Sequence, residues 1–279
     1  MVPASLLAGK GIPPARKGNN ERQSTMNRYE NILRLYDAYV DGYREADGKL
    51  PKMMQLKRTH TAFVVKNARE VGEGEGFSPQ LLEDAMIAAL LHDTGRYEQL
   101  KIYNTFRDSD SVDHAVFSHK IVMEKGWVDD KAILDAILFH NRRDVPDGLD
   151  ERTLKLSHIV RDADKLDIFR VLETEIAATD WRKDSRAFWN LAVNEPPNPA
   201  VVTAIMERRA VDYQNIKSLS DFVLIQVGWM VSGLYYATSR RLCRERGHLA
   251  FRRDFLHQLT DSPEIDRICD FALCALGQA

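Results

Sequence analysis

The sequence predicts an all-α fold. Apolar residues keep a helical period almost to the C-terminus, and in the first periodic segment they are Tyr29, Ile32, Leu33, Tyr36, Val40 and Tyr43. Helix-start signals accompany this pattern, with a capping side chain before a proline at Ser78-Pro79, Asn198-Pro199 and Ser262-Pro263. Segments of alternating polarity joined by hairpin turns are missing, so helices alone are expected.

The first residues precede any helical pattern. Residues 1–25 combine prolines and glycines with scattered basic side chains, so we expect a disordered tail there. The basic charge also fits an organelle address. A loose tail or an upstream start codon is favoured, because Met26 stands just before the first periodic helix. Further along, Asp129 precedes the apolar run KAILDAILFH and is the expected start of that helix.

Breakers separate the periodic segments at 72–76 (GEGEG), 144–148 (DVPDG) and 194–199 (NEPPNP). The last one divides the chain into an expected domain over residues 26–195 and C-terminal helices over residues 196–279, packed on the same core. We expect one long helix from about Leu219 to Arg246, ending at Gly247. Its apolar residues cover more than a narrow stripe, which favours a buried packing helix over a dimer surface.

Composition indicates a soluble globular protein with a sizeable core. The chain has 279 residues, 44% of them hydrophobic, and 39 basic against 41 acidic residues give a net charge of −2. No broad basic field is available for nucleic acid, and no segment approaches the ~18 to 20 apolar residues of a membrane span. The three cysteines, Cys243, Cys269 and Cys274, have no CxxC spacing, which favours reduced thiols in the cytoplasm. We expect a homodimer only because homodimers are the commonest oligomers of soluble proteins.

The dipeptide His92-Asp93 is the main candidate for chemistry. It follows the apolar run MIAALL and comes just before Gly95. An imidazole and a carboxylate at a helix end can ligate one metal together, and the second carboxylate oxygen can reach another ion. Asp93 is therefore a candidate bridging ligand.

Further candidate ligands recur roughly one helix and turn apart: His60, His114, His140 and an aspartate of RDADKLD at 161–167. One ligand per helix is the arrangement of a metal site in a helical bundle. On a helix His60 can point inward while Lys57 and Lys66 stay in solvent. His158 and His257 are expected to be ordinary hydrogen-bonded histidines. Because successive helical residues lie about 100° apart, Asp162, Asp164 and Asp167 occupy different faces, and only one of them fits the site.

Short sequence motifs over roughly residues 55–175 resemble those of the HD-domain superfamily of metal-dependent phosphohydrolases. These motifs are KRTHTAFVVKNA at 57–68, ALLHDTGRYEQ at 89–99, SVDHAVFSH at 111–119, ILFHN at 137–141 and RDADKLD at 161–167. The resemblance implies an HD-domain helical bundle with additional C-terminal helices. It favours Asp164 as the last ligand, with Asp162 second, and His114 over His119, which faces away from His114 on a helix.

With that ligand set, His60, His92, Asp93 and Asp164 would hold one divalent ion. Two imidazoles and two carboxylates suit Mn, Fe, Co, Ni or Zn better than Ca or Mg. For His114 and His140 two interpretations stay open. They bind a second ion with Asp93 as the bridge, or they remain without metal and stabilise or protonate the reacting phosphate.

The leading functional hypothesis is hydrolysis of a nucleotide or another small phosphorylated metabolite by a metal-activated water that attacks the phosphorus. In it Asp93 orients or deprotonates the water, while Lys165, Arg96 and His114 stabilise the phosphoryl group. Two alternatives stay open. One is a di-iron oxygenase, since some relatives use the same order of ligand types, and the other is a nucleotide sensor without turnover.

Overall fold

The computed structural model describes residues 18–182 and 191–277. Within these ranges the chain is helical, with short 3-10 turns and one isolated bridge between Ala192 and Ser218, and it contains no named strand. The predicted all-α fold is confirmed. None of the described helices is long and apolar enough to cross a membrane.

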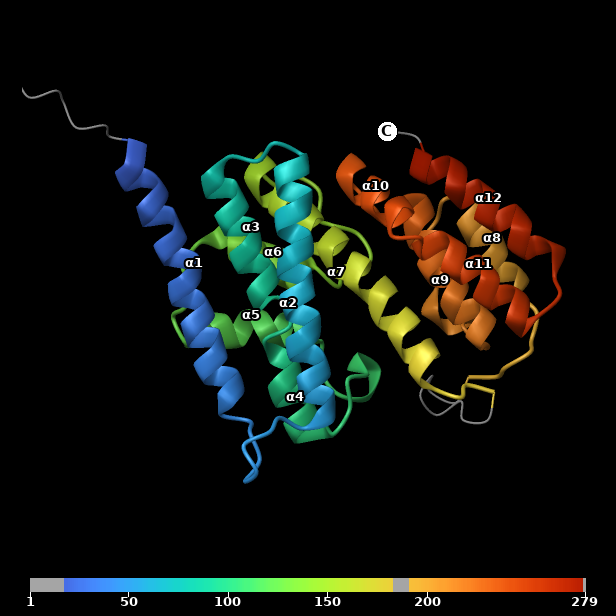
Figure 1. Cartoon of the computed structure of the whole chain (residues 1–279), viewed down its shortest axis with the longest axis horizontal. Helices are drawn as coiled ribbons and strands as arrows, with labels where there is room; N and C mark the ends of the chain where they lie inside the picture. The colour runs from blue at the N-terminus through green and yellow to red at the C-terminus, as the bar shows by residue number, and fades with distance from the viewer. Residues whose placement is uncertain (1–17, 183–190, 278–279) are drawn as a thin grey trace, which may run out of the picture.

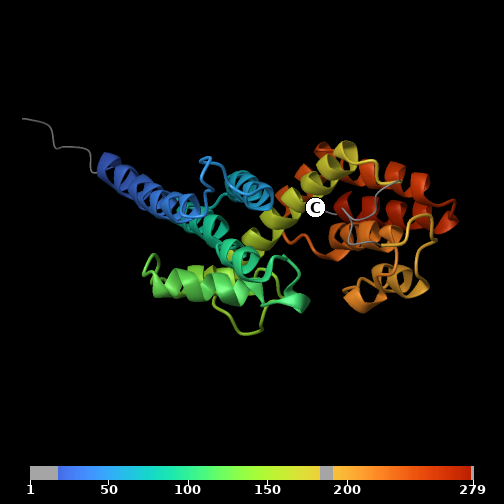
Figure 2. The ribbon, with the colours of Figure 1, turned by 90° about the horizontal axis from the view of Figure 1, so that it is seen from below.

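The helices form two sets on either side of α7 (Figures 1 and 2). The first set is α1 (Gly18–Asp41), α2 (Lys52–Gly74), α3 (Pro79–Leu91), α4 (Gly95–Tyr103), the short η1 (Asp108–Asp110), α5 (His114–Glu124) and α6 (Lys131–Phe139). The connecting helix is α7 (Glu151–Ala178). The second set is α8 (Pro199–Met206), η3 (Tyr213–Asn215), α9 (Leu219–Ser232), α10 (Ala237–Glu245), α11 (His248–Leu259) and α12 (Pro263–Gly277).

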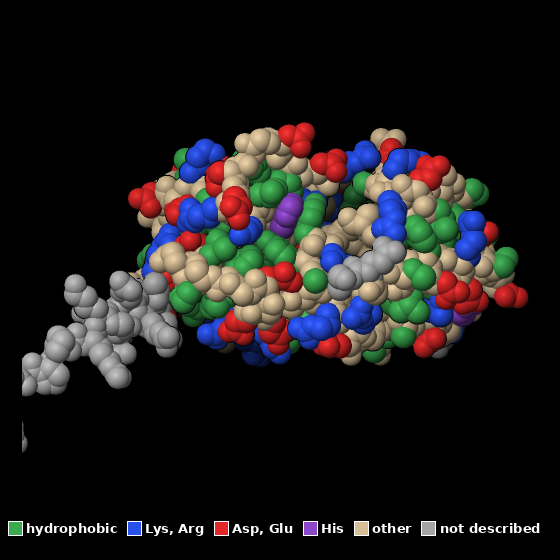
Figure 3. Space-filling view, turned by 90° about the horizontal axis from the view of Figure 1, so that it is seen from above, with side chains coloured by type: hydrophobic (Ala, Val, Ile, Leu, Met, Phe, Trp, Pro, Cys, Tyr) green, Lys and Arg blue, Asp and Glu red, His purple; other side chains and the backbone are tan. Residues whose placement is uncertain are grey.

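A continuous cluster of buried apolar side chains runs through both sets. It includes Val64 of α2, Leu166 of α7, Leu224 of α9 and Ile268 of α12. Helix α2 packs between α3 and α7, so the middle of the first set is enclosed by helices. On the face drawn in Figure 3, acidic and basic side chains intermingle. The boundary at residue 195 between two units stays a prediction.

The start of the chain differs in part from expectation. Helix α1 begins at Gly18, so residues 18–25 are helical and do not belong to a tail. The composition of 1–25 is dominated by the prolines and glycines before residue 18, whereas Glu21, Arg22 and Gln23 are good helix formers. Residues 1–17 lie outside the described part of the chain.

Helix α2 ends inside GEGEG, as expected, but the first two glycines of that segment still belong to the helix. Helix α2 continues through Gly72 and Gly74. A Cβ atom on Gly72 would lie 2.7 Å from the side chain of Leu82, and one on Gly74 would lie 2.5 Å from Thr238 Oγ1. These glycines allow other elements to approach α2 closely, which a sequence pattern does not distinguish from a helix stop.

The long helix predicted from Leu219 to Arg246 is wrong, because it is divided into α9 and α10. Helix α9 ends with Gly233 as its C-cap. The backbone N–H groups of Tyr235 and Tyr236 then donate to the buried carboxylate of Asp162 at 2.9–3.0 Å. The carboxylate of Asp162 therefore accepts hydrogen bonds from backbone amides that would donate within the helix if it were continuous.

Helix caps agree with the sequence in most places. Ser78 and Asn198 cap α3 and α8, each with a proline in the first turn, as predicted. The cap of α6 is Asp130 and not Asp129, since the Asp130 side chain accepts from the amides of Ala132 and Ile133. The prediction was in error by one residue because two aspartates stand side by side.

Candidate metal centre

Five helical elements deliver the predicted ligands to one buried place. His60 lies in the middle of α2, His92 is the C-cap of α3, His114 is the first residue of α5 and His140 is the C-cap of α6. Asp93 follows α3, and Asp164 lies in α7. The most exposed of these side chains is Asp164, at 17%. His114 is buried.

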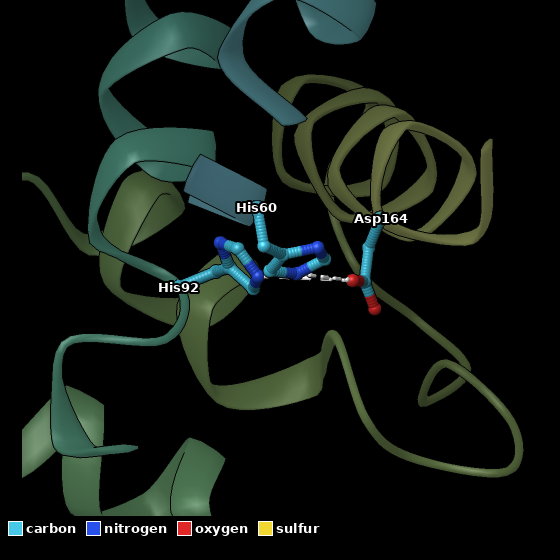
Figure 4. A group of neighbouring side chains, drawn as sticks. All are labelled: His60, His92 and Asp164. Atoms are coloured by element: carbon cyan, nitrogen blue, oxygen red, sulfur yellow. Dashed lines mark ion pairs between the residues drawn. The ribbon is translucent and has the colours of Figure 1, made fainter. Parts of the chain in front are cut away.

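One half of the site surrounds Asp93 Oδ2. This oxygen lies 3.7 Å from His60 Nε2 and 3.5 Å from His92 Nε2. Asp164 Oδ1 lies 3.1 Å from His60 Nε2 and 3.8 Å from His92 Nε2. Figure 4 shows the two imidazoles and the Asp164 carboxylate pointing toward one another. Candidate ligand atoms of His60, His92 and Asp164 all lie within 4.8 Å of one another.

The other half surrounds the second oxygen of the same carboxylate. Asp93 Oδ1 lies 3.5 Å from His114 Nε2 and 3.8 Å from His140 Nε2. The two Nε2 atoms are 3.0 Å apart. His92, Asp93 and His140 also have ligand atoms within 4.8 Å of one another. The Asp93 carboxylate thus lies between two pairs of imidazoles, which is the position of a bridging ligand.

All four histidines turn Nε2 toward Asp93 because Nδ1 is engaged elsewhere. Nδ1 of His92 contacts the carbonyl of Ala89 and Nδ1 of His140 that of Ile137, both at 2.7 Å. A carbonyl only accepts, so these Nδ1 atoms carry the proton and Nε2 keeps a lone pair.

The remaining two imidazoles are held by carboxylates. His60 Nδ1 contacts Asp167 Oδ2 at 2.6 Å, and His114 Nδ1 contacts Asp108 Oδ2 at 2.5 Å. Such partners fix the ring and make the other nitrogen a better metal ligand.

Unpartnered buried atoms test whether the residues fit a cation. His60 Nε2, His92 Nε2 and Asp93 Oδ1 are buried without a hydrogen-bond partner among the described residues. His60 Nε2 is close to Asp164 Oδ1 but outside the angular range of a hydrogen bond. Buried lone pairs without donors are costly unless they coordinate a cation. The mixed imidazole and carboxylate set fits a divalent transition metal.

A third group of close ligand atoms, on Asp108, Asp113 and His114, fits a metal less well. The Asp113 carboxylate caps α5 and also accepts from Asn141 Nδ2 at 2.8 Å. The Asp108 carboxylate accepts from His114 and Arg96. These oxygens already have donors.

The electrostatics keep Asp93, His92 and His140 in ligand form, whereas for His60 burial and Lys57 are outweighed by Asp164 and Asp167, which raise its pKa. Burial opposes ionisation of Asp93, but Lys57, His92 and Arg96 outweigh it and hold its pKa well below the ordinary value. Burial lowers the pKa of His92, and burial together with His114 lowers that of His140 further. At neutral pH Asp93 is therefore a carboxylate, and His92 and His140 are neutral imidazoles.

Arg96 and Lys165, the predicted cationic residues, both lie beside the site. Arg96 Nη1 is held by Gln99, Asp108 and the carbonyl of Phe106, while Arg96 Nε lies 3.5 Å from Asp93 Oδ1. Lys165 is buried next to Asp164, and its Nζ has one long contact of 3.4 Å to the carbonyl of Arg161. Burial and Arg161 lower the pKa of Lys165 to about 8. Arg96 is thus mainly engaged with the α4–α5 loop, and Lys165 keeps free donors with respect to the described residues.

Three contributors to the site were not predicted from the sequence. Lys57, expected in solvent, lies with Nζ 2.6 Å from Asp93 Oδ2 and is 18% exposed. Its position three residues before His60 places it on the same helix face, a signal that we did not use. Lys66 is 63% exposed, as expected.

Asp167 and Arg161 are the other two. Asp167 orients His60 without facing Asp93, and its spacing of three from Asp164 gave no indication of that role. Arg161 donates to the carbonyls of Phe139, His140, Arg142 and Arg143, so it fixes the end of α6 and the residue His140.

Two surface clefts formed by described residues lie away from the predicted ligands. A cleft of about 410 Å³ lies between α2, α7 and α10, and its lining includes Asp167 and His248 but no predicted ligand. A cleft of about 540 Å³ lies further along α7, beside Arg170 and Thr174. The chemistry of the buried side chains, and not cavity size, identifies the centre.

Comparison with known proteins agrees with this geometry. The family model of the HD domain matches residues 58–168, a range that contains all the predicted ligands. No curated protein and no solved structure matches the chain. The HD-domain family includes many metal-dependent hydrolases, and its members typically bind divalent metals. Residues 58–168 form an HD domain.

Proposed function

We propose that the protein is a metal-dependent hydrolase of phosphate esters that acts on a nucleotide or another small phosphorylated metabolite. One observation carries the proposal. The two oxygens of Asp93 each face two imidazole Nε2 atoms at 3.5–3.8 Å, and Nε2 of His60 and of His92 has no hydrogen-bond partner among the described residues. His60, His92, Asp93 and Asp164 would hold one divalent ion, and His114 and His140 would complete the site of a second.

A divalent ion bound there would supply Lewis-acid polarisation of a phosphoryl oxygen and a more acidic water molecule. Asp93, whose pKa is held well below its ordinary value by Lys57, His92 and Arg96 against the effect of burial, is a weak base, so it orients water and does not deprotonate it. Lys165, whose pKa is lowered to about 8 by burial and Arg161, is mostly protonated at pH 7 and would stabilise negative charge on the phosphoryl group. Arg96 would add fixed positive charge beside Asp93 Oδ1.

The test is metal analysis of the purified protein, followed by phosphate release from nucleotides and sugar phosphates with Mn, Fe, Co, Ni, Zn and Mg. We expect Asp164→Ala to lose both metal and turnover, because it removes the carboxylate 3.1 Å from His60 Nε2. Asp147→Ala, in the exposed loop before α7, is the matched control. Full phosphate release by metal-stripped protein would exclude this mechanism.

A di-iron oxygenase is the second candidate, and one observation favours it. The second pair of imidazoles, His114 and His140, faces Asp93 as closely as the first pair does, so the site has ligands for two ions. Iron loading under anaerobic conditions, then oxygen uptake with a candidate substrate, distinguishes the two reactions. Oxygen consumption without phosphate release would support the oxygenase.

We also propose a cytoplasmic protein that acts on a small substrate. The described cysteines are free thiols, with Cys243 and Cys269 buried and Cys274 exposed. The near balance of charge gives no reason to expect nucleic acid as a partner, and a homodimer stays a prediction.

A further inference from the structure

We propose that Lys57 is a tethered counter-cation of Asp93 that a divalent metal displaces, and that the displaced ammonium then binds a phosphoryl oxygen of the substrate. The first half concerns metal binding alone. The second half rests on the function proposed above.

The first observation is that Lys57 and the imidazoles share one oxygen. Lys57 Nζ lies 2.6 Å from Asp93 Oδ2, the same atom that faces His60 Nε2 and His92 Nε2. An N–O distance of 2.6 Å is that of a charge-assisted hydrogen bond. A metal ion in the ligand set needs the lone pairs of this oxygen and repels the ammonium. Metal and Lys57 therefore compete for Asp93.

Lys57 also has somewhere to move. Its Nζ lies 5.6 Å from the ring centroid of Phe106, in the loop between α4 and α5. The guanidinium of Arg96 lies 5.7 Å from the same ring. Lys57 is 18% exposed against 3% for Asp93, so its ammonium lies toward the solvent side of the carboxylate. A flexible four-carbon stem lets the charge shift by a few ångströms while it stays near the aromatic ring.

The neighbouring cations are less suited to this exchange. Arg96 is held by three acceptors and Arg161 by four carbonyls. Among the described residues, Lys57 has one hydrogen-bond acceptor, Asp93. When Asp93 ligates a metal, Lys57 loses that acceptor and needs another anion. A phosphoryl oxygen at the metal supplies one, so metal and substrate would bind cooperatively.

The experiment measures two affinities in opposite directions. Lys57→Met removes the competing charge, so Mn²⁺ should bind more tightly in calorimetry. In the Mn²⁺-loaded protein, inorganic phosphate should bind more weakly and KM for the phosphate ester should rise. Each change should be about tenfold or more, the equivalent of one hydrogen bond to a charged group. Lys66→Met, on the same helix and 63% exposed, is the control and should change neither affinity.

A merely structural lysine gives a different result, because its loss would weaken both metal and phosphate. That outcome, or unchanged metal affinity, overturns the proposal. Tighter metal binding with unchanged phosphate affinity overturns its second half. If the wild-type protein releases no phosphate from any ester, the proposed function fails, while the change in Mn²⁺ affinity still tests the competition. Lys57→Gln carries the same test if the Met variant does not fold, and Lys57→Arg should retain phosphate binding.

Discussion

At the scale of single residues, two kinds of hydrogen-bond partner fix the orientation of the four imidazoles. His92 and His140 end helices, and each donates Nδ1–H to a carbonyl three residues earlier. This arrangement is local and comes with the helix end itself. His60 and His114 depend instead on the side chains of Asp167 and Asp108. Their orientation can therefore be altered without changing the backbone.

Asp167 provides the prediction at this scale. Asp167→Ala removes the acceptor 2.6 Å from His60 Nδ1, so the ring is free to rotate and Nε2 becomes less basic. We expect metal affinity to fall by about 10- to 100-fold, the usual effect of losing such a partner. Folding should persist, since Arg170, the other partner of Asp167, is 30% exposed and also stacks on Phe63. Calorimetric titration with Mn²⁺ measures the change.

Asp167→Asn separates orientation from charge, because its amide oxygen still accepts from Nδ1–H. Its loss of affinity should be smaller than that of the Ala variant. Asp37→Ala, which removes an exposed partner of Arg58, is the control. Equal affinity in the wild-type and Asp167→Ala proteins would show that His60 does not need Asp167 for metal binding.

At the scale of elements, the corner between α3 and α4 brings Asp93 to His114. Gly95, the first residue of α4, packs directly on the backbone of α5. Its amide donates to Ser118 Oγ at 2.8 Å. A Cβ atom there would lie 2.7 Å from Ser118 N and 3.0 Å from the carbonyl oxygen of His114. Glycine is required at this position because backbone atoms, unlike side-chain tips, cannot move aside cheaply.

The corresponding prediction is that Gly95→Ala forces α4 and α5 apart. The free energy of unfolding should fall by about 1–3 kcal/mol, the usual cost of overpacking, as measured by urea denaturation. Because His114 moves with α5, binding of the second metal ion should weaken more than binding of the first. Fewer ions should therefore be bound per protein. Gly277→Ala, at a helical glycine whose added Cβ would meet nothing within 4 Å, should leave stability nearly unchanged. Full stability of the Gly95→Ala protein would contradict this reading of the corner.

Much of this could be predicted because it is encoded locally. Helix caps such as Ser78 act within a few residues, helical periodicity places His60 on an inward face, and the resemblance to the HD-domain superfamily favoured Asp164. The errors have a common physical origin in contacts between distant segments. The end of α9 depends on Asp162, more than 70 residues earlier in the chain. The inward position of Lys57 depends on Asp93, in the turn between α3 and α4.

At the scale of the whole molecule, α7 serves two purposes on different faces. Asp164 faces the histidines, while Asp162, two residues away and about 200° around the helix, accepts from the first amides before α10. The loop after α2 adds a second contact, since Glu75 accepts from the amide of Thr238 at 2.8 Å. Because one helix carries both functions, movement of the C-terminal helices would be transmitted to a candidate ligand.

His158 makes the stability of the contact between α7 and the segment before α10 depend on pH. Its ring stacks on Tyr235, with centroids 3.7 Å apart and planes 8° from parallel. Burial, Arg161 and Lys165 lower the pKa of His158 to about 4, against about 6.5 in an unfolded chain. Between these values the unfolded state binds the extra proton. The stabilisation is therefore complete above about pH 6.5 and decreases as the pH falls toward 4.

His158→Phe keeps an aromatic ring against Tyr235 and removes the titrating group. In urea unfolding, the stability difference between variant and wild type should be constant above pH 7, which is the internal control. Below pH 6.5 the difference should shift in favour of the variant, because the wild type alone loses stability through residue 158. If the stability difference between variant and wild type stays the same from pH 7.5 to pH 5, His158 is excluded as a source of acid sensitivity at this contact. A shift of the opposite sign would mean that the imidazole gains a partner on protonation, contrary to its position beside Arg161 and Lys165.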